Sequence, residues 1–199
     1  VRPGEKGEPN KELKKSLSID DDTFVMSILA RYEESKGLDF LLNSIKLLKE
    51  RTSRKFVLLI AGDGILFEDM GELIEKLNLQ DCVKQLGFRK DTADILSISD
   101  LYINSSKCLE ALSFAMVEAL VNGLPIVATN IGGNPDIVSP QNDCGTLVEY
   151  GDCDAFAEAV REYIENEELL KKRSENAKAA AENVFNLDKL LDDTFKLYM

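Results

Sequence analysis

Short apolar runs that alternate with amphipathic segments most strongly constrain the fold of this 199-residue chain. FVMSILA at 24–30 and KFVLLIAGDG at 55–64 contain unbroken apolar stretches of strand length, and the second ends in a glycine-containing loop. Each is followed by a segment with apolar residues at helical spacing, first Leu38–Arg51 and then Phe67–Leu77. Buried strands that alternate with amphipathic helices indicate an α/β fold, with a parallel sheet covered by helices on both faces.

The same pattern continues along the rest of the chain. Further short strands are predicted at 83–86, 101–104, 126–128 and 146–148, and short helices at 11–17, 91–98 and 114–121. The last part is a charged helical tail, with helices expected at 155–164, 167–184 and 187–198. We therefore expect an N-terminal extension or linker over 1–22, one domain over 23–185, and a C-terminal helix over 186–199.

Charge and residue types exclude several classes of function. The formal charge of −12 disfavours a broad face for nucleic acid or for an anionic membrane. The absence of histidine excludes a histidine-based triad or general base within this chain, and four cysteines without a CxxC pair make a zinc site unexpected. The longest apolar runs are far shorter than the ~20 residues that span a bilayer. Scattered single cysteines fit a reducing cytosol, so we expect a cytoplasmic protein.

The polar residues of interest gather where the predicted strands end. Parallel strands end at one edge of the sheet, and ligands bind there, at the switch point of the strand order. Within the dense stretch 100–137, Glu110 and Glu118 lie eight positions apart across a loop-to-helix junction. Ser113 is a candidate N-cap for a helix over 114–121, whose free N–H groups would attract an anion. The two carboxylates suit ligand hydroxyls, although two solvated acids near a helix start are an equally good interpretation.

Two other loops carry candidate ligand contacts. Arg31 and Lys36 flank the loop after the first strand, and two cations there could clamp a diphosphate. On spacing alone, a solvated turn in which Glu33 and Glu34 are their partners is favoured over the clamp. The sequence at 62–64, Gly-Asp-Gly, permits a close backbone approach, but it is not the GxGxxG fingerprint of nicotinamide-binding proteins. Alone, it is better interpreted as a plain βα turn.

Taken together, these segments resemble a known family in their order along the chain. The matches are R-x4-K-G at 31–37, G-D-G at 62–64, L-G-F at 86–88, and E-x7-E at 110–118 running into E-A-L-x-x-G-L-P-I-V-A-T-x-x-G-G-N-P-D-I-V. This ordered set is similar to the C-terminal, nucleotide-sugar-binding domain of the GT-B glycosyltransferases, specifically the retaining family 4. The resemblance implies a Rossmann-like parallel sheet with helices on both faces and a helical C-terminal tail.

The resemblance also implies a role for each matching residue. Arg31 and Lys36 would bind the donor diphosphate and neutralise the leaving group, so no metal cofactor is expected. Glu118 would accept hydrogen bonds from the ribose, and Glu110 would hold the donor sugar and could serve in the retaining mechanism. The catalytic residues would then be Glu110, Arg31 and Lys36. Further contacts to a UDP-, GDP- or ADP-sugar would come from Gly62, Gly64, Gly87, Phe88, Ala111, Leu112, Ser113 and Phe114.

The reaction implied is transfer of a hexosyl group from a nucleoside diphosphate sugar to an acceptor hydroxyl, with retention of anomeric configuration. The expected setting is synthesis of cell-surface polysaccharide, lipopolysaccharide or glycolipid. A GT-B enzyme binds its acceptor glycan or glycolipid on an N-terminal domain that this sequence lacks, so we expect the donor-binding half of a longer protein. Nothing in this half is expected to insert into a membrane, and peripheral association at the inner face would come from the missing domain.

Three positions depart from the family pattern. Ala111 and Ser113 stand where glycine is usual or frequent, and Asn104 stands where proline is common. These departures leave the identity of the sugar undefined. They also leave open an alternative function, a non-catalytic nucleotide-sugar-binding or partner-binding module that has kept the fold.

Overall fold

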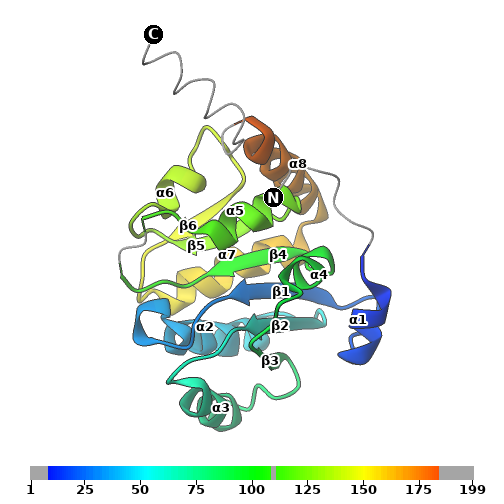
Figure 1. Cartoon of the computed structure of the whole chain (residues 1–199), viewed down its shortest axis with the longest axis vertical. Helices are drawn as coiled ribbons and strands as arrows, with labels where there is room; N and C mark the ends of the chain where they lie inside the picture. The colour runs from blue at the N-terminus through cyan, green and yellow to red at the C-terminus, as the bar shows by residue number, and fades with distance from the viewer. Residues whose placement is uncertain (1–8, 109–110, 184–199) are drawn as a thin grey trace.

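The computed structural model describes residues 9–108 and 111–183, which form a six-stranded sheet with helices packed around it (Figure 1). In chain order the elements are α1 (Lys11–Ser16), β1 (Phe24–Leu29), the 3-10 helix η1 (Glu34–Lys36), α2 (Leu38–Arg51), β2 (Phe56–Ala61), α3 (Phe67–Lys76), β3 (Val83–Gly87), α4 (Thr92–Ser97), β4 (Leu101–Asn104), α5 (Phe114–Val121), β5 (Ile126–Thr129), α6 (Asn134–Ile137), β6 (Gly145–Val148), α7 (Cys153–Glu165) and α8 (Glu167–Asn183). The predicted α/β class and the helical C-terminal part are confirmed.

The six strands of the described residues are all parallel and lie in the order β3-β2-β1-β4-β5-β6. Leu29 pairs with Ala61 at the ends of β1 and β2, and Asn104 pairs with Ala128 near the ends of β4 and β5. The order reverses between β1 and β4, and such a switch point favours a ligand crevice outside the carboxyl ends of the two strands. The strand arrows point to the left in Figure 1, so this carboxyl edge lies at the left of the view.

Alternate strand residues pack on opposite faces of the sheet, which explains why β1 and β2 are continuously apolar. Met26 and Leu58 belong to a core shared with α2, α3 and α7. Val25 and Leu59 face the other way, toward α1 and α4. Farther along that second face, Ile126 packs with residues of α5 and α8. Figure 1 shows α4 and α5 in front of the sheet and α7 behind it.

The helix α1 packs onto this second face. Asn10 caps it, because its Oδ1 atom accepts a hydrogen bond from the Leu13 N–H at 3.0 Å. Leu13 and Ile19 are each 8% exposed and belong to the same core cluster as Val25. Part of the segment that we expected to be an extension or linker therefore contributes to the core.

Two predicted features need comment. No helix was predicted at 134–137, but these residues make one short helix with Pro135 in its first turn, where its missing N–H breaks no helical hydrogen bond. The predicted helix at 187–198 lies outside the described residues. No helix within 9–108 or 111–183 is long and apolar enough to cross a bilayer.

Candidate functional site

The loops that follow β1 and β4 meet at the switch point. Ser105 Oγ donates to the carbonyl oxygen of Lys36 at 2.8 Å, and the Lys107 N–H donates to the carbonyl oxygen of Ser35 at 2.8 Å. Gly37 adopts φ +59°, and a Cβ there would lie 2.3 Å from the carbonyl oxygen of Ser105. Only glycine permits this approach, so the two loops lie directly against each other.

A small pocket lies where the two loops meet. Its walls include Ala30 and Lys36 from the first loop, Asn104 and Ser106 from β4 and the second loop, and Ser113 at the start of α5. A larger pocket between α2, β2 and β3 lies at the opposite edge of the sheet and contains none of the predicted site residues. The small pocket therefore brings two of the predicted site residues, Lys36 and Ser113, into one cavity wall.

The predicted clamp residues Arg31 and Lys36 lie on the loop after β1. The guanidinium of Arg31 pairs with Glu33 Oε1 at 2.9 Å, and 76% of the Arg31 side chain is exposed. Ser35 Oγ donates to the same carboxylate oxygen at 2.7 Å. An exposed ion pair of this kind contributes roughly 0–1 kcal/mol, so a phosphate could replace the glutamate at little energetic cost. The local partner that the sequence offered for Arg31 is thus present, yet Arg31 stays accessible to a ligand.

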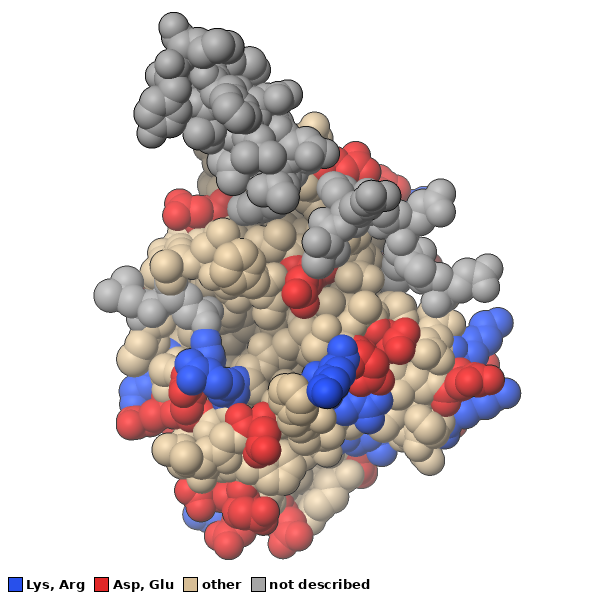
Figure 2. Space-filling view, in the orientation of Figure 1, with Lys and Arg blue, Asp and Glu red and all other residues tan. Residues whose placement is uncertain are grey.

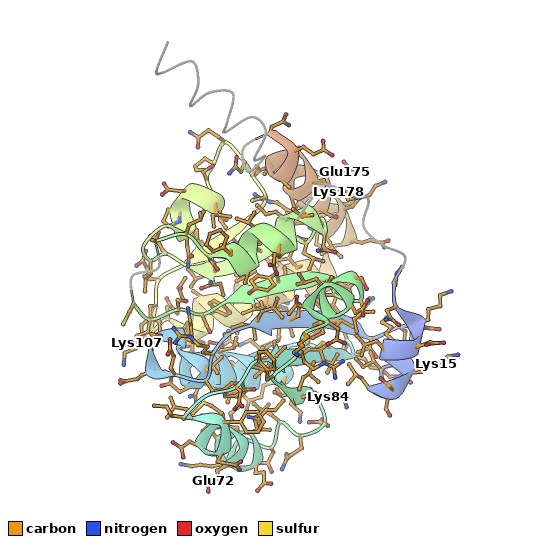
Figure 3. All side chains as sticks on the ribbon, viewed as in Figure 1. Lys15, Glu72, Lys84, Lys107, Glu175 and Lys178 are labelled. Atoms are coloured by element: carbon orange, nitrogen blue, oxygen red, sulfur yellow. The ribbon has the colours of Figure 1, made fainter. Side chains whose placement is uncertain are left out.

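A second ion pair joins the two loops at their exposed rim. Lys107 Nζ lies 2.7 Å from Glu34 Oε1, and this hydrogen bond lowers the pKa of Glu34 and raises the pKa of Lys107. Figure 3 shows Lys107 beside the segment that leads into α2, on the opposite side of the molecule from Lys15 of α1. Sequence reasoning missed Lys107, because 73 positions separate it from Glu34 and no motif links them. Within the part of the chain that the structure describes, no group of three or more His, Cys, Asp or Glu residues could hold a metal ion.

Helix α5 begins at the predicted residue, at the carboxyl edge of the sheet. Ser113 occupies the predicted N-cap position, but its side chain makes no capping hydrogen bond; its Oγ lies 3.5 Å from Asn104 Nδ2 instead. A helix N-terminus without a side-chain cap is suited to an anion. Glu118 lies in the second turn of α5 and is half-buried. Glu110, its predicted partner, lies outside the described residues.

Large apolar side chains are exposed along the same edge. Phe114 at the start of α5 is 77% exposed, Leu112 just before it is 43% exposed, and Ile65 after β2 is 89% exposed. Ala111 is exposed as well. Figure 2 shows acidic and basic side chains interspersed over the face of the molecule that is turned toward the viewer in Figure 1. Leu112 and Phe114 thus place two exposed apolar side chains beside the N-terminus of α5.

The end of β3 contains the residues predicted to lie beside the nucleotide base. The pairing register shifts so that Ala61 lies opposite Gly87, which forms a bulge. Gly87 has φ +66°, and nothing lies within 4 Å of the position that a Cβ would take. Phe88 follows it and is 70% exposed. At the carboxyl edge, Phe88 is therefore open to solvent, and Gly87 is half-buried with free space beside its Cα.

The glycine loop after β2 packs against the backbone of the loop after β1. Gly62 and Gly64 have φ +147° and +155°, and a Cβ on each would lie 1.9 Å from the carbonyl oxygen of Ala30 and 2.5 Å from that of Tyr32, respectively. The Tyr32 N–H also donates to the carbonyl oxygen of Asp63 at 2.9 Å. Contacts within the protein therefore account for both glycines.

A buried polar cluster lies beneath the loop after β4. Ten polar side chains are buried among the described residues, and six of them gather here. The six are Asn104, Ser105, Ser106, Ser113, Thr129 and Asn134. Thr129 and Asn134 were not predicted as site residues, because they lie near the end of another strand and carry no charge.

Comparison with known proteins assigns the chain to a family. The family model described as "Glycosyl transferases group 1" matches residues 9–180, nearly the whole of the described chain. The protein therefore belongs to the group 1 glycosyltransferases, and the resemblance stated from the sequence is confirmed.

Individual relatives are similar over almost the whole chain. N-acetyl-alpha-D-glucosaminyl L-malate synthase of Bacillus anthracis is 26% identical over 187 residues, which cover 94% of this chain and 48% of the relative. UDP-Gal:alpha-D-GlcNAc-diphosphoundecaprenol alpha-1,3-galactosyltransferase of Escherichia coli is 29% identical, over 93% of this chain and 48% of its own length. The chain thus spans about half the length of the curated relatives it matches.

Solved structures show the same fold. The crystal structure of Anabaena Alr3699/HepE in complex with UDP superposes with a TM-score of 0.84 at 23% sequence identity. The match covers 94% of this chain and 51% of that one. The predicted Rossmann-like domain of a GT-B protein is therefore confirmed as a fold.

Proposed function

We propose that this chain is the donor-binding half of a retaining glycosyltransferase. It would transfer a hexosyl group from a nucleoside diphosphate sugar to an acceptor hydroxyl. The observation that carries the proposal is the junction of the loops after β1 and β4, which brings the Arg31–Lys36 segment against the loop that leads into α5. Cations on one side of a pocket and a helix N-terminus on the other form a suitable site for a diphosphate.

The comparisons support the same ligand class. The superposed Anabaena protein was crystallised with UDP, and the name of the E. coli relative gives UDP-galactose as its donor and a diphosphoundecaprenol-linked sugar as its acceptor. Because the present chain matches only half of such relatives, its acceptor would be bound by a second domain. The acceptor would be a glycan or glycolipid, and any peripheral contact with the inner face of the cytoplasmic membrane would come from that domain.

Each site residue has a proposed task. Arg31 and Lys36 would bind the diphosphate and offset the charge that develops on it as the glycosidic bond breaks, which makes a metal ion unnecessary. Glu118 would accept hydrogen bonds from the ribose, and Glu110 would hold the sugar hydroxyls. The other contacts would come from the carboxyl edge of the sheet, namely from Gly62, Gly64, Gly87, Phe88, Ala111, Leu112, Ser113 and Phe114.

Calorimetric titration with UDP, GDP and ADP tests the proposal on this chain. We expect one of the three to bind, and Arg31→Ala to weaken it by roughly tenfold or more, because a charged hydrogen bond to phosphate is lost. Glu118→Ala should weaken binding by a similar factor. Arg54→Ala is the matched control, since Arg54 is an exposed cation at the opposite edge of the sheet. Failure of all three nucleotides to bind, or equal binding by the Arg31 and Glu118 variants, would refute the site.

A further inference from the structure

The buried polar cluster at the ends of β4 and β5 contains six of the ten buried polar side chains among the described residues. Polar side chains removed from water are retained only where they are hydrogen-bonded, and such networks fix one arrangement of the chain. The other four buried polar residues, Ser27, Ser44, Ser97 and Ser99, lie elsewhere in the fold and are all serines. The two asparagines that are buried among the described residues both lie in the cluster, so their side-chain amides distinguish it from the other buried polar positions.

Asn104 contacts both ends of the loop between β4 and α5. Its Oδ1 atom accepts hydrogen bonds from the Ser106 N–H at 3.1 Å and from Asn134 Nδ2 at 3.3 Å. Its Nδ2 atom lies 3.5 Å from Ser113 Oγ, at the start of α5. Only 6% of Asn104 is exposed, so these contacts form out of reach of bulk water. One side chain thus links the residue that enters the loop with the residue that leaves it.

Asn134 and Thr129 hold the same loop from the side of β5. Asn134 Nδ2 donates to the carbonyl oxygen of Thr129 at 3.0 Å as well as to Asn104. Thr129 Oγ1 donates to the carbonyl oxygen of Ser106 at 2.8 Å. Asn134 is fully buried, and its Oδ1 atom has no hydrogen-bond partner among the described residues. Among the described residues, the hydrogen bonds of this amide are therefore made by Nδ2, which makes them sensitive to any change at that atom.

We propose that Asn104 and Asn134 are positioning residues for the donor site, which fix the two ends of the loop between β4 and α5, at Ser106 and Ser113, beside the loop that carries Arg31 and Lys36. The inference rests on the proposed function, because the loop matters only if its backbone and the start of α5 contact the donor. A loop held in place before the ligand arrives loses less conformational freedom on binding, so affinity is higher. The amide pair would act through Ser106 and Ser113 without touching the ligand.

Three substitutions test this role in the chain as it stands. Asn104→Ala and Asn134→Ala remove the amides, and Thr129→Val removes one hydroxyl while keeping the shape of a β-branched strand residue. Each should weaken UDP binding in calorimetry, by roughly tenfold for the asparagines and less for Thr129→Val. Because all act on one loop, the Asn104→Ala/Asn134→Ala double variant should bind about as weakly as the weaker single variant.

The matched control is Ser99→Ala, which removes a buried hydroxyl from another part of the same face. Ser99 Oγ lies 2.8 Å from Ser27 Oγ and 2.7 Å from the carbonyl oxygen of Ile95, away from the loop. This variant should melt at a lower temperature but bind UDP as tightly as the parent. In the ligand-free protein, amide hydrogen exchange at 105–108 and 111–113 should be faster in the asparagine variants and unchanged in Ser99→Ala.

Asn134→Asp provides a readout that general destabilisation would not imitate. It places a carboxyl oxygen where Nδ2 now donates to two oxygens, so the carboxyl must be protonated to restore one of those bonds. UDP affinity relative to the parent at the same pH should therefore recover toward about pH 5 and fall toward about pH 8, on either side of a raised carboxyl pKa.

The outcomes separate the two proposals. If the parent binds UDP and the asparagine variants bind it equally well, the positioning role is overturned and the proposed function stands. If the parent binds none of UDP, GDP and ADP, the proposed function fails and this inference fails with it. Weakened binding with unchanged loop exchange would also overturn the inference, because the loop would not be the part that moves.

Discussion

The loops after β2 and β4 leave the same edge of the sheet, yet they are held in place by opposite means. The loop after β2 has glycines at 62 and 64, where the absence of a side chain lets the neighbouring backbone approach. The loop after β4 is held by hydrogen bonds from the buried side chains of Asn104, Thr129 and Asn134. The loop after β2 has no room for an added side-chain atom. In the loop after β4, removal of a polar side-chain atom would leave a buried polar group unpaired.

This difference decides how each loop can carry function. A loop fixed by close backbone contacts is a rigid wall, because its position follows from the strands beside it. A loop fixed by hydrogen bonds can be adjusted by single substitutions at residues that never touch a ligand. Among the described residues, the loop after β4 therefore offers the more adjustable side of the candidate site.

The largest loss of stability should come from a glycine-to-alanine substitution in the loop after β2. Gly62→Ala would place a Cβ 1.9 Å from the carbonyl oxygen of Ala30 at φ +147°. Backbone strain and overpacking together should lower the free energy of unfolding by roughly 3 kcal/mol or more. Urea denaturation measures this loss directly.

Gly87→Ala is the control for the effect of backbone conformation alone. Gly87 also has positive φ, at +66°, but a Cβ there would meet nothing within 4 Å. Only the conformational penalty of about 1 kcal/mol should remain. Equal losses in the two variants would show that the contact with Ala30 is unimportant and would remove the basis of the comparison.

The next largest loss of stability should come from ionisation of Tyr32 at high pH. The Tyr32 backbone hydrogen-bonds to the loop after β2, and its ring packs on Phe67 at a centroid distance of 4.9 Å. Burial raises the pKa of Tyr32 to about 12. A raised pKa means that the folded state favours the neutral phenol, so this stabilisation is complete below about pH 10 and is lost as the pH rises toward 12. Between neutral pH and pH 12, the free energy of unfolding of the parent should therefore fall by roughly 2 kcal/mol more than that of Tyr32→Phe.

Unfolding free energies of parent and Tyr32→Phe, measured from neutral pH to about pH 12, test this expectation. Burial also raises the pKa values of Cys82 and Cys144 to about 11, but both thiols are present in both proteins and cancel in the difference. Parallel curves for the two proteins would mean that the Tyr32 hydroxyl titrates as if exposed.

The glycine loop after β2 could be predicted from the sequence, but the hydrogen bonds that hold the loop after β4 could not, and the reason is physical. Apolar periodicity is local, so the helices at 38–51 and 114–121 were predicted to the residue, and the Gly-Asp-Gly turn was recognised where it stands. The hydrogen bond between Asn104 and Asn134 joins residues 30 positions apart and follows no period. The helix α6 was missed because four residues are too few to show helical periodicity.

The candidate site divides in the same way. Arg31 and Lys36 could be selected from the sequence because charged residues after a predicted strand are visible without a fold. Glu118 could be selected because of its spacing from Glu110 at the start of a predicted helix. That Ser105 contacts the carbonyl oxygen of Lys36 could not be predicted, since it depends on β1 and β4 being neighbours in the sheet. Strand order is a property of the whole chain, and no short motif specifies it.

A smaller effect is expected where the two loops at the switch point are joined. Ser105→Ala removes the buried hydroxyl that donates to Lys36, and Ser105 is 1% exposed. The loss should be about 1 kcal/mol in urea denaturation, because the carbonyl oxygen of Lys36 loses this donor. Ser44→Ala is the matched control: its buried hydroxyl donates only to Phe40 within α2, and alanine favours the helix, so little or no loss is expected.

The smallest effect should come from the exposed pair between the same two loops. Glu34→Gln removes the charge that pairs with Lys107, but 85% of the Glu34 side chain is exposed, and water and salt screen the attraction. Because Lys107 lowers the pKa of Glu34, any stabilisation from the pair is present at neutral pH and is lost as the pH falls through that lowered pKa. We expect the urea midpoint at neutral pH to be indistinguishable from that of the parent. If the urea midpoint of Glu34→Gln fell as far as that of Ser105→Ala, the exposed ion pair would join the two loops as strongly as the buried hydrogen bond. Buried hydrogen bonds would then not be what distinguishes the loop after β4 from the loop after β2.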